Sequence, residues 1–360
     1  MRIYFDHNAT SPLRPSARAA MLAAMDVTGN ASSVHGEGRA ARKIVDDARE
    51  AIAQELGVIP PMIVFTSGGS EANNFAIKGV DVERLLVSAI EHPSVMESAH
   101  ASGKTVEIIP VTAGGVIDME RFRAILPGPK ALVSVMLANN ETGVIQPLRE
   151  VAGLTREHGA LLHTDAVQAF GKISVNFGLL GADMMTVSAH KFGGPLGAGA
   201  LIVRDGLPVR PLIHGGGQEL RRRAGTENLA AIAGFAAVVL SKRQDIKELR
   251  DRLETELEQL VIFGRDADRL PNTTCFAAPG LNAETLLMSL DLEGIAVSSG
   301  SACSSGKVAK SHVLAAMGVA PEIASASIRV SLGWNTTAQD IDHFIAVWGR
   351  IRARHRAKAA

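Results

Sequence analysis

The sequence predicts an α/β protein with a large, mainly parallel sheet domain and a smaller α+β domain. Two observations support this prediction. Before residue 250, short apolar runs alternate with longer segments of helical periodicity. Strands that are apolar on both faces and separated by helices are typical of a parallel sheet covered by helices. After residue 250 the pattern changes to short strand-like runs between two helical segments, which indicates a separate α+β unit.

The large domain is placed at residues 13–249. Apolar runs predict buried strands at 63–66, 85–88, 131–135, 160–163 and 184–187. Helical periodicity between these runs predicts helices at residues 39–56 and 147–158. The uncharged run at residues 229–240 is shorter than the roughly 20 residues that a membrane span needs, so it predicts a core helix.

The small domain is assigned residues 1–12 and 250–360. A charge-rich segment at residues 242–260 has apolar residues at helical spacing and is expected to be a helix that links the two domains. The elements expected after it are strands at 272–276, 295–297 and 327–331 and helices at 283–293 and 338–354.

Composition and charge exclude several classes of protein. The 37 Lys+Arg residues balance the 37 Asp+Glu residues, and aromatic residues make up only 4%, so neither nucleic acid nor a membrane is an expected partner. Cys275 and Cys303 are the two cysteines of the chain, which excludes a disulfide framework and a multi-cysteine metal site. The first residues are charged where a secretory signal would be apolar, so the expected compartment is the cytoplasm.

A run of small residues at 65–73 follows a predicted strand and opens a helix. Backbone N–H groups around Gly69 and the hydroxyl of Ser70 suit a phosphate at such a helix start. A Gly-Ser turn is also an ordinary helix cap, and both interpretations stay open from this segment alone. The run has neither dinucleotide-binding nor Walker A spacing, which disfavours dinucleotides and nucleoside triphosphates.

Asp165 and Lys191 each follow a predicted buried strand. Asp165 is either a helix cap or the partner of a cationic group. Lys191 lies in a tight Gly/Pro loop, where it is either a Schiff-base lysine or a surface lysine. A phosphate cradle, an acid and a lysine, in this order, are the parts that hold pyridoxal phosphate. Their order resembles the fold-type I pyridoxal-phosphate enzymes of the class V aminotransferase branch.

Two further residues lie in patterns that suggest chemistry. Cys303 lies in a Ser/Gly-rich segment at residues 297–306, which is typical of an exposed loop and makes it a candidate nucleophile or sulfur carrier. Cys275 lies on an apolar strand and is expected to be a small buried hydrophobe. Arg329, alone among apolar strand residues, suits the capture of a substrate carboxylate or an internal ion pair.

Ten motifs in order give the chain a nearly end-to-end resemblance to the cysteine desulfurases of the NifS/IscS-like family. They lie at residues 4–12, 65–73, 91–95, 139–143, 163–166, 188–191, 214–219, 223–226, 298–303 and 327–329. The resemblance implies the fold of the fold-type I pyridoxal-phosphate-dependent transferases, with a large mainly parallel α/β domain and a smaller α+β domain. It also implies a homodimer and the cofactor pyridoxal 5′-phosphate.

The resemblance implies catalytic roles for three residues. Lys191 would form the Schiff base, His92 would stack on the cofactor ring and act as acid and base, and Cys303 would take the sulfur. Asp165 would face the pyridine nitrogen, and Gln168 would face the ring hydroxyl.

The resemblance also implies how phosphate and substrate are held. Asn140 and Arg329 would bind the carboxylate of the substrate, L-cysteine. Thr226 would reach the phosphate from a second subunit. The residues that would hold the phosphate within one subunit are Gly69, Ser70, Ser188 and His190.

The implied activity is cysteine desulfuration, which yields L-alanine and a persulfide on Cys303. The persulfide would pass to an acceptor or iron–sulfur scaffold protein, and transient iron–sulfur ligation by Cys303 is the one metal contact considered. The alternatives are a selenocysteine lyase, another class V aminotransferase, and a catalytically idle binding partner. An aminotransferase has no need of Cys303, and an idle partner has no need of Lys191, Asp165 or His92.

Overall fold

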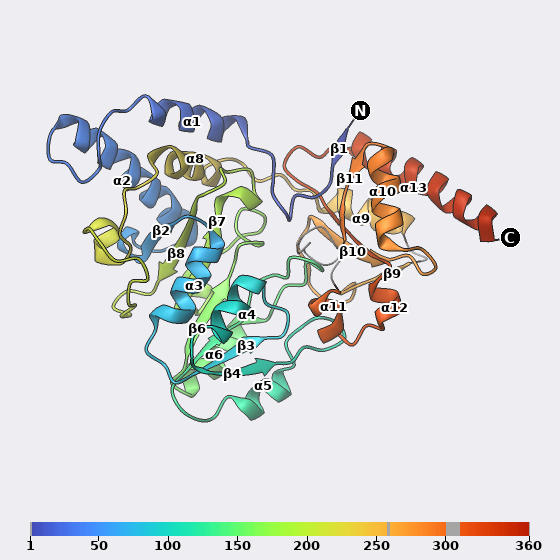
Figure 1. Ribbon diagram of the computed structural model, residues 1–360, viewed down its shortest axis with the longest axis horizontal. Helices are drawn as coiled ribbons and strands as arrows, with labels where there is room; N and C mark the ends of the chain where they lie inside the picture. The colour runs from blue at the N-terminus through green and yellow to red at the C-terminus, as the bar shows by residue number, and fades with distance from the viewer. Residues whose placement is uncertain (1, 258–259, 300–309, 360) are drawn as a thin grey trace.

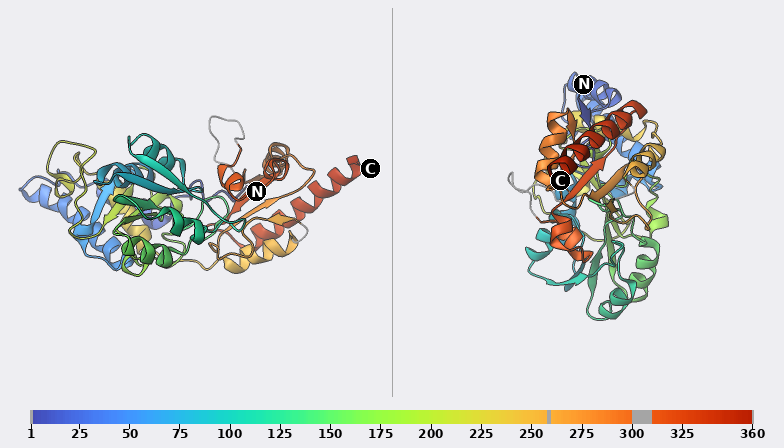
Figure 2. Two further views of the ribbon diagram at one scale, coloured as in Figure 1. Left: turned by 90° about the horizontal axis from the view of Figure 1, so that it is seen from below. Right: turned by 90° about the vertical axis from the view of Figure 1, so that its right-hand side faces the viewer.

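The computed structural model describes residues 2–257, 260–299 and 310–359. Its strands form a seven-stranded sheet, a four-stranded sheet and a two-stranded sheet. The large sheet and the two small sheets lie at opposite ends of an elongated molecule, and α13 (Ala338–Ala359) projects at the end with the small sheets (Figures 1 and 2). Within the described ranges, no helix combines the length and apolar composition that crossing a membrane requires.

The seven-stranded sheet has the order β2-β8-β7-β6-β5-β3-β4. Its strands are β2 (Ile63–Thr66), β3 (Arg84–Ser88), β4 (Thr105–Ile109), β5 (Ala131–Ser134), β6 (Leu161–Asp165), β7 (Met184–Ser188) and β8 (Gly199–Val203). Neighbours from β4 to β7 pair in parallel, whereas β8 runs antiparallel to both β2 and β7. The five predicted strands are confirmed within two residues at each end, and the prediction of a mainly parallel sheet is confirmed as well.

Helices cover both faces of this sheet (Figure 1). Ile63 and Phe65 join one hydrophobic cluster and Val64 joins another, because successive strand residues point to opposite faces. The first cluster contains residues of α1 (Pro15–Met25), α2 (Gly36–Leu56), α5 (Met119–Ile125), α6 (Leu148–Glu157), α7 (Phe177–Leu180) and α8 (Leu229–Val239). The second contains residues of α3 (Gly69–Gly79) and α4 (Pro93–His100).

The second group of elements has its own hydrophobic core. Its helices are α9 (Lys247–Glu256), α10 (Ala283–Leu292), α11 (His312–Ala316), α12 (Pro321–Ala324) and α13. Its strands are β1 (Ile3–Tyr4), β9 (Val261–Ile262), β10 (Thr273–Ala277), β11 (Ile295–Ala296), β12 (Ser298–Ser299) and β13 (Ser327–Ser331). Antiparallel strands in the order β12-β13-β10-β9 form one sheet, and β1 pairs in parallel with β11. Phe5 therefore packs in one core with Phe276, Phe344 and Trp348.

Two helices differ by five residues or more from their predicted lengths. The expected helix at residues 242–260 is only α9, because Ile246 is not helical (φ −118°) and Asp245 Oδ1 instead accepts the N–H of Lys247. The closing helix α13 runs to Ala359 rather than residue 354. The domain boundaries at residues 12 and 249 stay a prediction.

Candidate active site

Five of the site residues predicted from sequence follow strand ends at one edge of the large sheet. Gly69, His92, Asn140, Asp165 and Lys191 come after or at the C-terminal ends of β2, β3, β5, β6 and β7, which all run in the same direction. This edge is where α/β sheets bind ligands. The five residues line one cavity of about 420 Å³. Ser70, Gln168, Ser188, His190 and Arg329 line the same cavity.

Asp165 is a buried carboxylate at the end of β6. Its side chain lines the cavity although the residue is only 4% exposed. One oxygen, Oδ1, accepts the N–H of Val167 at 2.9 Å, and Oδ2 accepts Asn73 Nδ2 at 2.7 Å. Both oxygens are thereby fixed in orientation, and the site gains a negative charge at a defined position.

Lys191 ends a short 3₁₀ turn (Ala189–Lys191) directly after β7. Its Nζ donates to the backbone carbonyls of Asn8 and Ala9, both at 2.9 Å. Burial, and then the charge of Arg329, lower the pKa of Lys191 to about 8. Near neutral pH, a fraction of the molecules therefore carries Lys191 as the free amine. The free amine is the form that attacks a carbonyl carbon.

Two histidines beside Lys191 are held in the neutral form. His92 Nδ1 accepts the N–H of Ser94 at 3.1 Å where α4 begins. Burial lowers the pKa of His92. The charge of Asp165 raises this pKa, whereas Lys191 and His312 lower it further. Burial and the charges of Lys191 and Lys172 lower the pKa of His190 to about 4. A neutral imidazole is able to accept a proton at pH 7.

Arg329 reaches the cavity from β13 of the small sheet. Its Nη2 donates to Asp6 Oδ1 at 2.7 Å, and its Nη1 donates to the carbonyl of Asn140 at 3.2 Å. The internal ion pair that the sequence left open is therefore present, with Arg329 only 4% exposed. A guanidinium has five N–H groups, so donors remain for a carboxylate. One of them, Nε, has no partner among the described residues.

Two predicted residues are not part of this cavity as described. Thr226 lines a different hollow, together with Arg223 and Glu219. Cys303 lies outside the described residues. The other cysteine, Cys275, is fully buried in β10 as predicted, and burial raises the pKa of its thiol.

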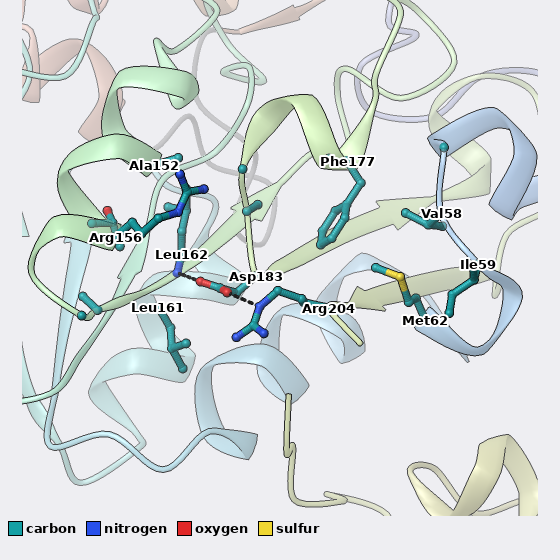
Figure 3. Close-up of a pocket in the computed structure, with 17 residues that line it drawn as sticks. Val58, Ile59, Met62, Ala152, Arg156, Leu161, Leu162, Phe177, Asp183 and Arg204 are labelled. Atoms are coloured by element: carbon teal, nitrogen blue, oxygen red, sulfur yellow. Dashed lines mark hydrogen bonds and ion pairs between the residues drawn. The ribbon is translucent and has the colours of Figure 1, made fainter. Parts of the chain in front are cut away.

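A second hollow, of about 940 Å³, lies elsewhere on the large sheet (Figure 3). Figure 3 shows Asp183 between Leu162 and Arg204, with Phe177 and Met62 facing the same space. The carboxylate accepts the N–H of Leu162 at 2.8 Å and Arg204 Nε at 2.6 Å. The charge of Asp183 is already paired with Arg204. The smaller cavity around Lys191 is therefore the better candidate for the active site.

Sequence reasoning assigned no role to Asp6, Asn8, Asn73 or Lys172, although all of them contact predicted site residues. Asn73 had a usable signal, since it lies one helical turn after Gly69 in the predicted phosphate segment. Asp6 and Asn8 lie in the motif at residues 4–12, but the motif did not show what they contact, because their partners lie more than a hundred residues away in the chain.

The geometry agrees with comparisons to known proteins. A model of the aminotransferase class-V family matches residues 3–344. The chain belongs to the aminotransferase class-V family. It is similar to the cysteine desulfurase IscS of Dictyoglomus turgidum, with 41% identity covering 97% of this chain and 94% of that protein.

Solved structures give the same result. A NifS-like protein from Rickettsia africae superposes with a TM-score of 0.91 at 37% identity, covering 98% of this chain and all of that one. A structure of SspA in complex with cysteine matches with a TM-score of 0.83 at 32% identity, covering 92% of this chain and 99% of that one. These matches confirm the predicted fold class, that of the fold-type I pyridoxal-phosphate enzymes.

Enzymes of this family depend on pyridoxal 5′-phosphate, so the predicted cofactor is confirmed. The residues of the cavity fit that group. Gly68 has φ +152°, and a Cβ on Gly69 would lie 2.9 Å from Val167 Cγ2, so only small residues leave the start of α3 open. Open N–H groups at the start of this helix suit a phosphate. Asp165 and Lys191 supply the carboxylate and the amine.

Proposed function

We propose that this protein is a cysteine desulfurase that removes sulfur from L-cysteine and leaves it as a persulfide on Cys303. The observation that carries the proposal is the meeting of Lys191, His92 and Arg329 around the buried Asp165 in one cavity. An amine, a neutral base and a carboxylate-binding cation are the groups that cleavage of an amino acid requires. The names of the relatives and the cysteine complex of SspA support L-cysteine as that amino acid.

Bound pyridoxal phosphate supplies an electron sink that makes the Cα–H and Cβ–S bonds of the amino acid labile. Lys191 would hold the cofactor covalently and, once displaced, carry a proton to or from the substrate carbon. Asp165 would face the pyridine nitrogen, and Gln168 would hold the ring hydroxyl. His92 would stack on the ring and move protons through its imidazole.

Phosphate and substrate would be held by opposite sides of the cavity. Asn140, which follows β5, and Arg329, which comes from β13 of the small sheet, would take the carboxylate of L-cysteine. The phosphate would lie on the large-sheet side, against Gly69, Ser70, Ser188 and His190.

The sulfur transfer to Cys303 needs no external oxidant or reductant. The thiolate of Cys303 attacks the substrate sulfur, an S–S bond forms, and the Cβ–S bond breaks with its electron pair left on carbon. That carbon takes up a proton, and L-alanine leaves. The sulfur carried by Cys303 would then pass to an acceptor protein for iron–sulfur cluster assembly or another sulfur-transfer reaction.

Three further features belong to this proposal. The protein would act as a homodimer in which Thr226 completes the phosphate site of the partner subunit. It would work in the cytoplasm with an acceptor or scaffold protein. Cys303 would be its only contact with iron, and a transient one.

The test is the release of alanine and sulfide from L-cysteine, with a reductant present, by the wild-type protein and by Cys303→Ala. The matched control is Cys275→Ala, which removes the other, buried thiol. Visible spectra of all three proteins report whether the cofactor is bound. We expect wild type and Cys275→Ala to release both products, and Cys303→Ala to keep the cofactor band while releasing little of either.

Two results would contradict the proposal. If Cys303→Ala is as active as wild type, Cys303 is not the acceptor. If wild type binds the cofactor but releases no alanine from L-cysteine, the activity is another one of the class V family. Selenocysteine and amino-group acceptors are then the substrates to assay.

A further inference from the structure

Lys172 lies behind the active-site cavity without lining it. It follows β6 in the turn that begins after Asp165, and its Nζ donates to two side-chain amides. One bond runs to Asn8 Oδ1 at 2.7 Å and the other to Gln168 Oε1 at 2.8 Å. Burial, and then Lys191 and Arg329, lower the pKa of Lys172 well below its ordinary value. A lysine amine placed among other cations has an electrostatic cost, which its hydrogen bonds to the two amides offset.

The Lys172 nitrogen has two N–H groups even as the free amine and uses them to donate to both amide oxygens, whereas an amide group both donates and accepts. Lys172 therefore requires Asn8 and Gln168 to turn their oxygens towards it and their NH₂ groups away. For Gln168, the NH₂ group then donates to the carbonyl of Asn8 at 3.0 Å. Its second N–H has no partner in the described part of the chain, and the residue lines the cavity. A reversed amide would point an oxygen there instead.

The orientation of the Asn8 amide also affects the part of the cavity near Asn140 and Arg329. Its Oδ1 also accepts Asn272 Nδ2 at 3.0 Å, and its Nδ2 donates to the carbonyl of Asn140 at 3.1 Å. That carbonyl is the one that accepts Arg329 Nη1. The backbone carbonyl of Asn8 holds Lys191 Nζ. Lys172 and Asn272 thus orient the Asn8 side chain, whose Nδ2 and Arg329 Nη1 share the carbonyl of Asn140.

We propose that Lys172 is a positioning residue that sets the orientation of the Gln168 and Asn8 amides, so that Gln168 presents an N–H donor to the ring hydroxyl of the cofactor. This inference rests on the proposed function, which places that hydroxyl against Gln168. Lys172 acts through the two amides and has no contact with the reacting atoms.

The test is a pH titration of the visible absorption band of the cofactor-loaded protein. The variants are Lys172→Met, Gln168→Ala and the double variant. A donor at the ring oxygen favours the deprotonated chromophore, so its loss raises the midpoint of the titration. We expect Lys172→Met to raise the midpoint by about one pH unit, the size of one lost charged hydrogen bond. We expect the double variant to shift no further than Gln168→Ala does.

The controls separate positioning from charge and from folding. Lys172→Arg keeps a donor-only group next to a small crevice of about 30 Å³ and is expected to keep the wild-type midpoint. Lys172→Gln can accept as well as donate and is expected to raise it, which preserves the test if Lys172→Met does not fold. Lys104→Met removes a half-buried lysine that donates to the carbonyls of Ile77 and Val80, and should leave the midpoint unchanged.

Two results would overturn the inference while the proposed function stands. One is an unchanged midpoint in Lys172→Met. The other is a double variant whose shift is the sum of the two single shifts, because Lys172 would then act as a bare charge and not through Gln168. A wild-type protein that shows no visible band after loading with pyridoxal phosphate would instead overturn the proposed function, and this inference with it.

Discussion

Replacing Glu141 by Gln is expected to stabilise the protein at pH 8 and to change its stability little at pH 5. The carboxyl group is buried and accepts Ser311 Oγ at 2.5 Å. Burial raises its pKa from 4.5 to about 7, against the lowering effects of Ser311 and Arg329. The folded protein therefore holds this proton more tightly than the unfolded chain does.

The sign and the size follow from this difference. Below pH 4.5 both states are protonated, so Glu141 imposes no cost there. As the pH rises from 4.5 to 7 the unfolded chain ionises first, and the free energy of unfolding falls. The difference of about 2.5 pKa units corresponds to at most about 3.4 kcal/mol. At about 2.1 cal/mol/K per residue over 360 residues, that is about 4.5 °C in the melting temperature.

Calorimetric melting at pH 5 and pH 8 measures the effect. Glu141→Gln is compared with wild type and with Glu50→Gln, which changes an exposed glutamate on α2. The gain in melting temperature for Glu141→Gln should be clearly larger at pH 8 than at pH 5. The change in melting temperature for Glu50→Gln should be the same at both pH values. An equal change at both pH values, or a lower melting temperature at pH 8, would refute the reasoning.

Four other outcomes are expected. Lys191→Ala should lose the visible band and the desulfurase activity after cofactor loading. In wild type, the rate of cofactor loading should rise with pH through about 8, the pKa of Lys191, and a flat profile between pH 7 and 9 would contradict this. Arg329→Gln should raise the KM for L-cysteine about 10- to 100-fold and change kcat less, in steady-state kinetics. Gly69→Ala should weaken cofactor binding in equilibrium dialysis, because the new Cβ would meet Val167. The matched control, Gly153→Ala in α6, adds a Cβ that meets no other atom and should raise the free energy of unfolding by up to about 1 kcal/mol.

The sequence predicts the buried parts of the large sheet well. Strands such as β2 and β7 are buried along their whole length, so their apolar runs are continuous and bounded by turns. β4 was not predicted because it lies at the sheet edge, where most of its residues are partly or fully exposed and the apolar pattern is broken. β8 begins with two small residues and follows a Gly-rich loop, so its run resembles a continuation of that loop.

The candidate site divides in the same way. Residues on local motifs, such as Asp165 and Lys191, were found because their spacing to a strand end is visible in the sequence. Asp6 was not found as the partner of Arg329, because the two are 323 positions apart. Lys172 was not found because its role depends on the hydrogen bonds that it donates to Asn8 and Gln168. Those bonds follow from the three-dimensional positions of the two amides, which the sequence does not show.

The pairing of β1 with β11 has a consequence for how the protein is made. Ile3 pairs with Ile295, and the carbonyl of Asn8 holds Lys191, so this segment depends on partners that are synthesised much later than itself. At about 5–20 residues per second, a ribosome needs roughly 15–60 seconds to deliver the partner of β1. During that time the segment from Ile3 to Ala9 lacks its sheet partner. The cavity can therefore be completed only after β13 is synthesised, because Arg329 of that strand lines it, and the segment from Ile3 to Ala9 needs protection from other contacts until then.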